Sequence, residues 1–175
     1  ADHHVRKLGV QVDRQSPESP VRVAGNRNLL NQVLLNLINN AADAMSEASS
    51  RQLQVRVYTR KVTEVGYKTG YRRADYFKMG EEMVVVEIAD SGHGIDENDL
   101  PKIFEPFFTT KETGHGTGLG LSLAHMIMDR MLGTIDVSSS PGSGTTFFVK
   151  LQPETKIQMI KEAEYEGLQK EGAGH

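Results

Sequence analysis

Two glycine-rich stretches constrain this chain most, because neither is suited to the packed interior of a helix or strand. The first is Asp90-Ser-Gly-His-Gly-Ile95, and the second is Gly114-His-Gly-Thr-Gly-Leu-Gly-Leu-Ser122. Glycine has no Cβ, so a flat ligand can approach its backbone closely. The first stretch follows an apolar strand that ends at the Asp90 carboxylate, and the second opens a helix whose free N–H groups favour phosphate. We interpret the two stretches as loops that an adenine nucleotide bridges.

Composition bounds the class of protein. A length of 175 residues is most simply one domain, and 20 Lys and Arg against 23 Asp and Glu give a net charge of -3, which argues against nucleic acid as a partner. The absence of cysteine excludes disulfides and thiolate metal sites and fits a cytoplasmic protein. No apolar run approaches the roughly 20 residues that cross a bilayer. We therefore expect no membrane contact by this fragment, although its parent protein could be membrane-anchored.

Residues 26–46 carry the clearest helical periodicity, with Asn26 or Asn28 as the cap. One face is apolar and is predicted to face the core: Leu30, Val33, Leu34, Leu37, Ile38, Ala41, Ala44 and Met45. The opposite face is a stripe of amides and one carboxylate: Gln32, Asn36, Asn39, Asn40 and Asp43. A solvated helix face is the ordinary alternative, but asparagine lowers helix propensity and such a face usually carries Lys and Glu. The stripe therefore favours oxygen ligands for a hydrated Mg²⁺.

The remaining segments are predicted from alternation, caps and turn residues. Strands are expected at residues 10–12, 21–23, 51–59, 83–89, 134–139 and 145–151, and further helices at residues 96–102 and 119–132. In residues 60–82 tyrosines alternate with basic residues. They are interpreted as a hairpin or loop excursion whose tyrosines cover a sheet edge, with stacking on bases as the alternative.

Several common nucleotide sites are excluded by the motifs. A P-loop needs Gly-Lys followed by Ser or Thr, and the sequence contains no Gly-Lys pair. A dinucleotide fingerprint needs its glycines directly after a strand, whereas Gly114 follows a loop rich in Phe, Pro and Thr. The motifs of eukaryotic-type protein kinases are also absent. The nucleotide site therefore belongs to another class.

Five motifs in order then identify a resemblance. They are Gln32-Val-Leu-Leu-Asn36-Leu-Ile-Asn-Asn40-Ala, Asp90-Ser-Gly-His-Gly94, Phe104-Glu-Pro-Phe-Phe108 with Thr-Thr-Lys111, Gly116-Thr-Gly-Leu-Gly-Leu121 and Gly142-Ser-Gly-Thr-Thr-Phe147. Over roughly residues 10–152 the chain resembles the catalytic and ATP-binding domain of sensor histidine kinases, in the GHKL superfamily, and is most similar to the nitrogen-regulator type. Gyrase and Hsp90 share the first two motifs, but the short lid with its glycine string is more similar to the kinase branch.

The resemblance implies an α/β (α+β) two-layer sandwich of the Bergerat type. Its mixed, largely antiparallel sheet would be covered on one face by helices, with a short ATP lid at residues 104–117. Residues 10–152 would form the catalytic domain, and residues 1–9 the end of a linker helix, closed by Gly9, from a missing dimerisation and phosphoacceptor domain. Residues 153–175 would be a helical or disordered tail.

The resemblance also implies roles for individual residues. Asp90 would accept the adenine amino group, Gly94 and Thr145 would line the base, and Asn40 would hold Mg²⁺ with Asn36 beside it. The catalytic group would be Gln32, Asn36 and Lys111. The whole ATP site would be Asn36, Asn40, Asp43, Asp90, Gly92, Gly94, Ile95, Lys111, Gly116, Thr117, Gly118, Leu119, Gly120, Leu121 and Thr145.

Two positions depart from the pattern of that family. Many members have Glu, proposed as a general base, where this chain has Gln32, and an amide cannot take a proton at neutral pH. Many also have a basic residue where this chain has Asp43. Neutralisation of phosphate charge would then depend more on Mg²⁺ and Lys111. Catalysis would be chiefly positioning and electrostatics.

The function that the resemblance implies is transfer of the γ-phosphoryl group of MgATP to a histidine. No histidine of this chain has the surroundings of the family's phosphoacceptor, so the acceptor would lie on the dimerisation and histidine-phosphotransfer domain of the parent protein. The other expected partner is a response regulator, with the fragment monomeric and the parent a homodimer. The alternatives are a nucleotide-binding regulatory module without turnover and a GHKL ATPase of the gyrase or Hsp90 sort.

Overall fold

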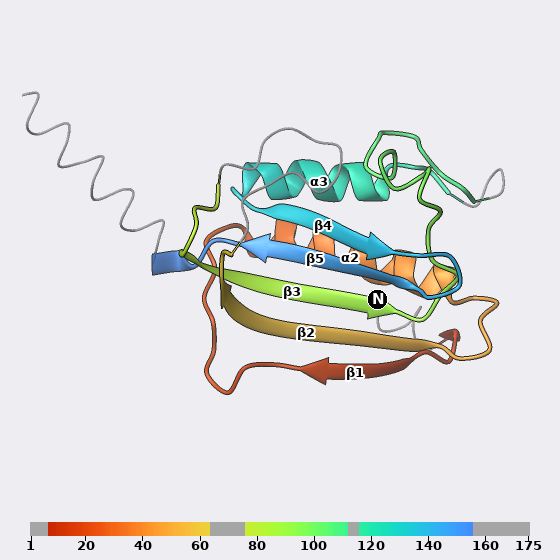
Figure 1. Cartoon of the computed structure of the whole chain (residues 1–175), viewed down its shortest axis with the longest axis horizontal. Coiled ribbons are helices and arrows are strands. Elements are labelled where there is room, and N and C mark those ends of the chain that lie inside the picture. The colour runs from red at the N-terminus through yellow and green to blue at the C-terminus, as the bar shows by residue number, and fades with distance from the viewer. Residues whose placement is uncertain (1–6, 64–75, 112–115, 156–175) are drawn as a thin grey trace, which may run out of the picture.

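The computed structural model describes residues 7–63, 76–111 and 116–155. These residues contain five strands and two helices (Figure 1). In chain order they are β1 (Gln11–Gln15), α2 (Arg27–Ala44), β2 (Gln52–Lys61), β3 (Glu82–Asp90), α3 (Gly120–Arg130), β4 (Thr134–Ser139) and β5 (Thr145–Leu151). Among these described residues, no helix is long and apolar enough to cross a membrane.

The strands form one sheet in the order β1-β2-β3-β5-β4. β1 runs parallel to β2, and the other three pairs are antiparallel. Figure 1 shows β3 in the middle of the sheet, with β1 at one edge and β4 at the other. The predicted mixed, largely antiparallel sheet is therefore confirmed.

Helix α2 begins where the sequence predicts. The Asn26 side chain accepts hydrogen bonds from the backbone N–H groups of Asn28 (2.8 Å) and Leu29 (3.2 Å), which satisfies two of the donors that a helix start leaves open. The predicted apolar face is buried at Val33, Leu37 and Ala41. Ala42, outside the predicted face, is buried as well.

The main core lies between the sheet and both helices, so the predicted two-layer fold is confirmed. Side chains alternate along a strand, and one set from each of the four strands β2 to β5 faces the helices. The buried members of this core include Leu53, Val84, Val86, Ile88, Ile135, Phe147, Val149 and Leu151 from strands and Val33, Leu37, Ala41, Ala124, Ile127 and Met128 from helices. Each fully buried large aliphatic side chain contributes about 1.5–3 kcal/mol through removal from water.

The opposite face of the sheet carries a smaller apolar cluster. Val62, Phe77, Met83 and Val85 are buried there, and Tyr58 and Tyr76 pack against them. The tyrosines of this region were predicted to cover a sheet edge, and the two among the described residues, Tyr58 and Tyr76, pack against this cluster. Tyr67 and Tyr71 lie in residues 64–75, outside the described residues.

The predicted excursion at residues 60–82 is shorter in the structure. Lys61 pairs with Glu82 as the last rung between β2 and β3. Beyond it, Val62 N–H donates to Glu81 O at 2.8 Å and Gly80 N–H donates to Val62 O at 2.9 Å. The two strands therefore extend by a few residues into the predicted excursion.

Two predicted elements are wrong. Residues 21–23 form a single antiparallel bridge, Val23 to Pro153, in place of a strand. Residues 96–102 form successive turns in place of a helix. Asp96 still caps these turns, because its side chain accepts from the Asn98 backbone N–H at 2.9 Å. Pro101 has no N–H to continue a helical ladder, which explains why the turns do not become a helix.

The predicted linker helix and tail are only partly described. Lys7 is helical, and Gly9 has a φ of 66°, the left-handed conformation expected of a residue that closes a helix. At the other end Glu154 and Thr155 begin a helix. Residues 1–6 and 156–175 lie outside the described residues.

Candidate functional site

Four residues lie opposite one another across the end of the sheet. Ser139 on β4 pairs with Thr145 on β5, Thr145 pairs with Asp90 on β3, and Asp90 pairs with Leu53 on β2. Along each strand, every second side chain points into the helix-facing core, and these four residues occupy such positions. We call Ser139, Thr145, Asp90 and Leu53 the end row, and their side chains lie on the helix face of the sheet. Sheet pairing thus brings Asp90 and Thr145, both predicted site residues, next to each other.

The Asp90 side chain is buried, with 8% of the residue exposed. Its Oδ1 accepts hydrogen bonds from the backbone N–H groups of Gly92 (2.8 Å) and Thr145 (3.3 Å). Burial raises the pKa of Asp90 above its ordinary value, and the two N–H groups and the nearby His93 oppose that rise. An ionised carboxylate here is an acceptor held in place by backbone.

The loop after Asp90 packs between α2 and the β4–β5 turn. His93 N–H donates to Ala44 O at 3.2 Å. A Cβ on Gly92 would lie 2.7 Å from Ala44 O, and a Cβ on Gly94, whose φ is 74°, would lie 2.1 Å from Ser140 O. These two predicted site glycines are therefore also required by packing of the loop.

The Ser139 hydroxyl connects this loop to the β4–β5 turn through hydrogen bonds. It accepts from Ile95 N–H, donates to Gly144 O and lies against Thr145 Oγ1, each at 2.9 Å. Ser139 was not among the predicted site residues. The available signal was its place in the alternation of residues 134–139, where Ile135 and Val137 point to the core and a hydroxyl takes the next core-facing position.

The polar stripe of α2 meets the start of α3. Asn36 Nδ2 donates to Gly120 O at 3.1 Å, which directs the amide nitrogen toward α3 and leaves the Asn36 carbonyl oxygen to accept elsewhere. Asn40 and Asp43 are half-buried on the same helix, whereas Gln32 is exposed. The amide stripe is thus partly covered and only in part a solvated face.

Lys111, in the predicted lid, reaches the same helix. Its Nζ lies 2.5 Å from Asp43 Oδ2, and each of the two side chains is 37% exposed. Gly116 passes close by, since a Cβ there would lie 2.6 Å from Thr109 Oγ1 and 3.2 Å from Lys111 Cδ. The lid lysine and the α2 stripe are therefore in direct contact.

The described ends of the predicted lid are joined through the backbone. Phe107 N–H donates to Gly118 O at 2.9 Å. Phe107 and Gly118 both have left-handed backbones, with φ of 68° and 65°, and a Cβ on Gly118 would lie 2.3 Å from Phe107 C. Residues 112–115, between these ends, lie outside the described residues.

Helix α3 starts directly after the predicted lid and has no side-chain cap. The first N–H groups of a helix have no partner within the helix, so the start of α3 favours an anion. Leu119 and Thr117 are exposed there, and Gly120 and Leu121 are half-buried. This is the segment predicted to contact phosphate.

The donor set fits Mg²⁺ bound mainly through phosphates. The described residues contain no cluster of three or more His, Cys, Asp or Glu that could hold a metal ion. Asn36 and Asn40 offer neutral amide oxygens on one helix face, and Mg²⁺ commonly uses one or two protein oxygens with substrate phosphates and water. Such a site needs a nucleotide to complete it.

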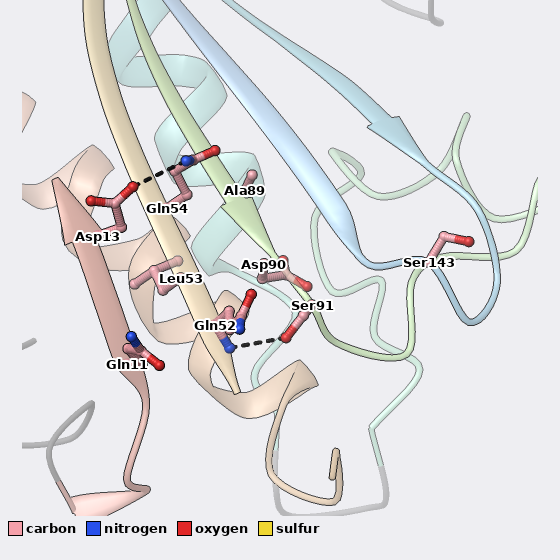
Figure 2. A pocket seen from close by; sticks show the side chains of 9 residues that line it. All are labelled: Gln11, Asp13, Gln52, Leu53, Gln54, Ala89, Asp90, Ser91 and Ser143. Atoms are coloured by element: carbon pink, nitrogen blue, oxygen red, sulfur yellow. Dashed lines mark hydrogen bonds between the residues drawn. The ribbon is translucent and has the colours of Figure 1, made fainter. Parts of the chain in front are cut away.

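A polar pocket of about 480 Å³ lies across the ends of β1, β2 and β3 (Figure 2). It is lined by Gln11, Asp13, Gln52, Leu53, Gln54, Ala89, Asp90, Ser91 and Ser143. Figure 2 shows the Asp13 and Gln54 side chains joined by a hydrogen bond of 3.1 Å. By alternation, most of these strand side chains lie on the face away from the helices. Asp90 is the one lining residue that the predicted ATP site shares.

Comparison with known proteins gives these findings. The family described as Histidine kinase-, DNA gyrase B-, and HSP90-like ATPase matches residues 25–155. The sensor kinase CckA of Brucella abortus is 45% identical over 124 residues, covering 69% of this chain and 12% of that protein. The signal transduction histidine-protein kinase AtoS of Escherichia coli is 37% identical over 129 residues, covering 74% of this chain and 17% of that protein. This chain therefore spans less than a fifth of either relative.

Among solved structures, the catalytic domain of histidine kinase ThkA has a TM-score of 0.62 with this chain at 28% sequence identity. The similarity covers 86% of this chain and 84% of that domain. The similarity in fold thus extends over more than four fifths of both chains.

Proposed function

The chain belongs to the family of histidine kinase-, DNA gyrase B- and HSP90-like ATPases, and from this we propose that it binds MgATP and donates the γ-phosphoryl group to a histidine of another domain. Its relatives are sensor histidine kinases, and its fold is that of their catalytic and ATP-binding domain. The nitrogen-regulator subtype stays a prediction.

The observation that carries the proposal is the buried Asp90 carboxylate beside Thr145. Both side chains face the helix layer at the end of the sheet, and backbone N–H groups hold the carboxylate. Adenine presents an amino group that can donate to such an acceptor. Gly92 and Gly94 let the loop after Asp90 pack closely against its neighbours, and Ile95 N–H is hydrogen-bonded to Ser139. The base would therefore lie against the backbone of this loop.

The phosphates are assigned to the region where α2, α3 and the predicted lid meet. The uncapped start of α3 would supply N–H groups, Lys111 would supply a positive charge, and Asn36 and Asn40 would supply amide oxygens to a hydrated cation. Bound Mg²⁺ would neutralise charge on the phosphate oxygens. Lys111 would exchange its contact with Asp43 for a phosphate oxygen, which keeps its charge at the transferring group.

In the reaction, the bond from the γ-phosphorus to the bridging oxygen breaks and ADP leaves with the electron pair. A new P–N bond forms to the imidazole, whose proton passes to solvent. Gln32 is exposed on α2 and cannot take that proton, so its proposed role is to orient the imidazole. Positioning and electrostatics then supply most of the rate enhancement.

The whole protein's activity and partners follow as proposals. The acceptor histidine would lie on a dimerisation domain of the parent protein, which would be a homodimer and would pass its phosphoryl group to a response regulator. The catalytic domain itself would be monomeric and would work in the cytoplasm. No nucleic acid is involved.

The kinase reaction is tested by mixing the chain with labelled ATP, Mg²⁺ and the parent's phosphoacceptor domain. We expect acid-labile label on that domain. Binding of MgATP without transfer of any label would favour a regulatory module that lacks turnover. Gln32 and Asp43, which depart from the family pattern, are the reason for considering this alternative. Rapid ATP hydrolysis by the chain alone would favour an ATPase of the gyrase or HSP90 sort.

A further inference from the structure

The Ser139 hydroxyl makes three contacts at the end of β4. It accepts from Ile95 N–H at 2.9 Å, donates to Gly144 O at 2.9 Å, and lies 2.9 Å from Thr145 Oγ1. Nothing in the family resemblance assigns a role to this serine. Its neighbour Thr145 is buried, with 5% of the residue exposed, and pairs with Asp90 in the sheet.

The proton of each hydroxyl follows from counting donors. A hydroxyl has one proton and two lone pairs, whereas a carbonyl oxygen can only accept. Ser139 therefore gives its proton to Gly144 O and uses one lone pair for Ile95 N–H. The contact between Ser139 and Thr145 must then use the proton of Thr145. The Thr145 hydroxyl is left with lone pairs for any other partner.

We propose that Ser139 is a positioning residue that sets the preference of this site for 6-aminopurines over 6-oxopurines. By taking the proton of Thr145, it leaves Thr145 and Asp90, which are side by side, as acceptors only. This inference rests on the proposed binding of adenine nucleotide beside Asp90.

The chemical consequence depends on the purine edge. A 6-amino group donates a hydrogen bond, so it can bind to the acceptors Asp90 and Thr145. A 6-oxo oxygen is itself an acceptor, so it cannot form a hydrogen bond with two groups that only accept. Without the Ser139 hydroxyl, the Thr145 hydroxyl can rotate and donate to a 6-oxo oxygen. Asp90 would still oppose that oxygen, so the preference should fall without vanishing. The lost hydrogen bond to Ile95 N–H would weaken the binding of both purines alike.

The test compares ADP with inosine diphosphate by calorimetry on the whole 175-residue chain. For Ser139→Ala we expect the ratio of the two affinities to fall roughly three- to tenfold, the worth of one net hydrogen bond. Ser139→Thr keeps a hydroxyl and should keep the wild-type ratio. In a Thr145→Val background, Ser139→Ala should leave the ratio unchanged, because valine has no hydroxyl that could rotate and donate to the 6-oxo oxygen.

A ratio that Ser139→Ala does not change would overturn the inference, as would an equal fall in the Thr145→Val background. If Ser139→Ala does not fold, Ser139→Cys replaces it, since a thiol is a weak donor of nearly the same shape. Failure of the proposed function gives a different result: the wild-type chain would not bind ADP, or Asp90→Asn would bind it equally well.

Discussion

At the residue scale, the surroundings of each site residue restrict which hydrogen bonds it can make and which side chain fits there. Asp90 is a buried carboxylate that backbone N–H groups hold, and Ser139 and Thr145 complete the same row of the sheet. The glycines around it lie where a side chain would meet backbone atoms. Each of these residues therefore allows a substitution with a defined result.

The first prediction concerns the charge on Asp90. Burial raises its pKa in the folded state above the ordinary value of 3.8. Between those two pKa values the folded chain holds more protons than the unfolded chain, so stability falls as pH rises through that window and is level above it. Urea unfolding of wild type and Asp90→Asn across acidic pH should show wild type losing stability relative to the variant as pH rises. A relative gain would contradict this account.

The second prediction uses two glycines of the β4–β5 turn. Gly144 and Gly142 have φ of 84° and 76°, but a Cβ on Gly144 would lie 1.9 Å from Asp90 O, whereas Gly142 has nothing within 4 Å. Gly142→Ala should cost about 1–2 kcal/mol from backbone strain alone. Gly144→Ala should cost more and weaken nucleotide binding, because Asp90 must move. Equal losses in the free energy of unfolding would show that the contact at Gly144 is not restrictive.

At the element scale, the site is formed where α2 meets its neighbours. Its polar stripe contacts the start of α3 through Asn36 and the lid through Asp43, and its last turn contacts the loop after Asp90 through Ala44. Periodicity alone predicted the helix and the two faces, because both depend on local spacing. The partners of those faces were not predictable in this way, since Lys111 and Gly120 are far along the chain.

The third prediction tests the contact between α2 and the lid. Both side chains of the Lys111–Asp43 pair are 37% exposed, so water and salt screen the attraction. A double-mutant cycle with Asp43→Ala and Lys111→Ala should give a coupling of about 0.2–1 kcal/mol at low salt. The coupling should fade in about 1 M salt. A coupling that salt does not change would contradict a surface ion pair.

The fourth prediction compares two asparagines of the stripe. If Asn40 supplies the protein oxygen to Mg²⁺, Asn40→Ala should weaken nucleotide binding roughly tenfold with Mg²⁺ present and less without it. Asn39→Ala removes the same chemistry from the neighbouring position and is the matched control. Calorimetry with ADP, with and without Mg²⁺, gives the comparison. Equal losses at both Mg²⁺ levels for Asn40→Ala would exclude the metal role.

At the scale of the whole molecule, the sheet separates two surfaces. The helix face carries the core and the end row, and the other face carries the smaller cluster of Val62, Phe77, Met83 and Val85 and the polar pocket of Figure 2. The candidate site on the helix face follows from the sequence motifs, because each motif can be recognised within a short stretch of sequence. Neither the pocket nor Ser139 was predicted, because both depend on which strands pair and in which register. Pro101 likewise overrode a helical pattern that the neighbouring residues favoured.

The most direct test of the central claim is the affinity of the chain for MgADP, measured by calorimetry for wild type and for Asp90→Asn. The amide of asparagine can present N–H₂ donors where the adenine amino group needs an acceptor. We predict binding by wild type and at least a roughly tenfold loss in Asp90→Asn, with the fold intact by thermal unfolding. Equal affinity in the two proteins would contradict an adenine site at Asp90.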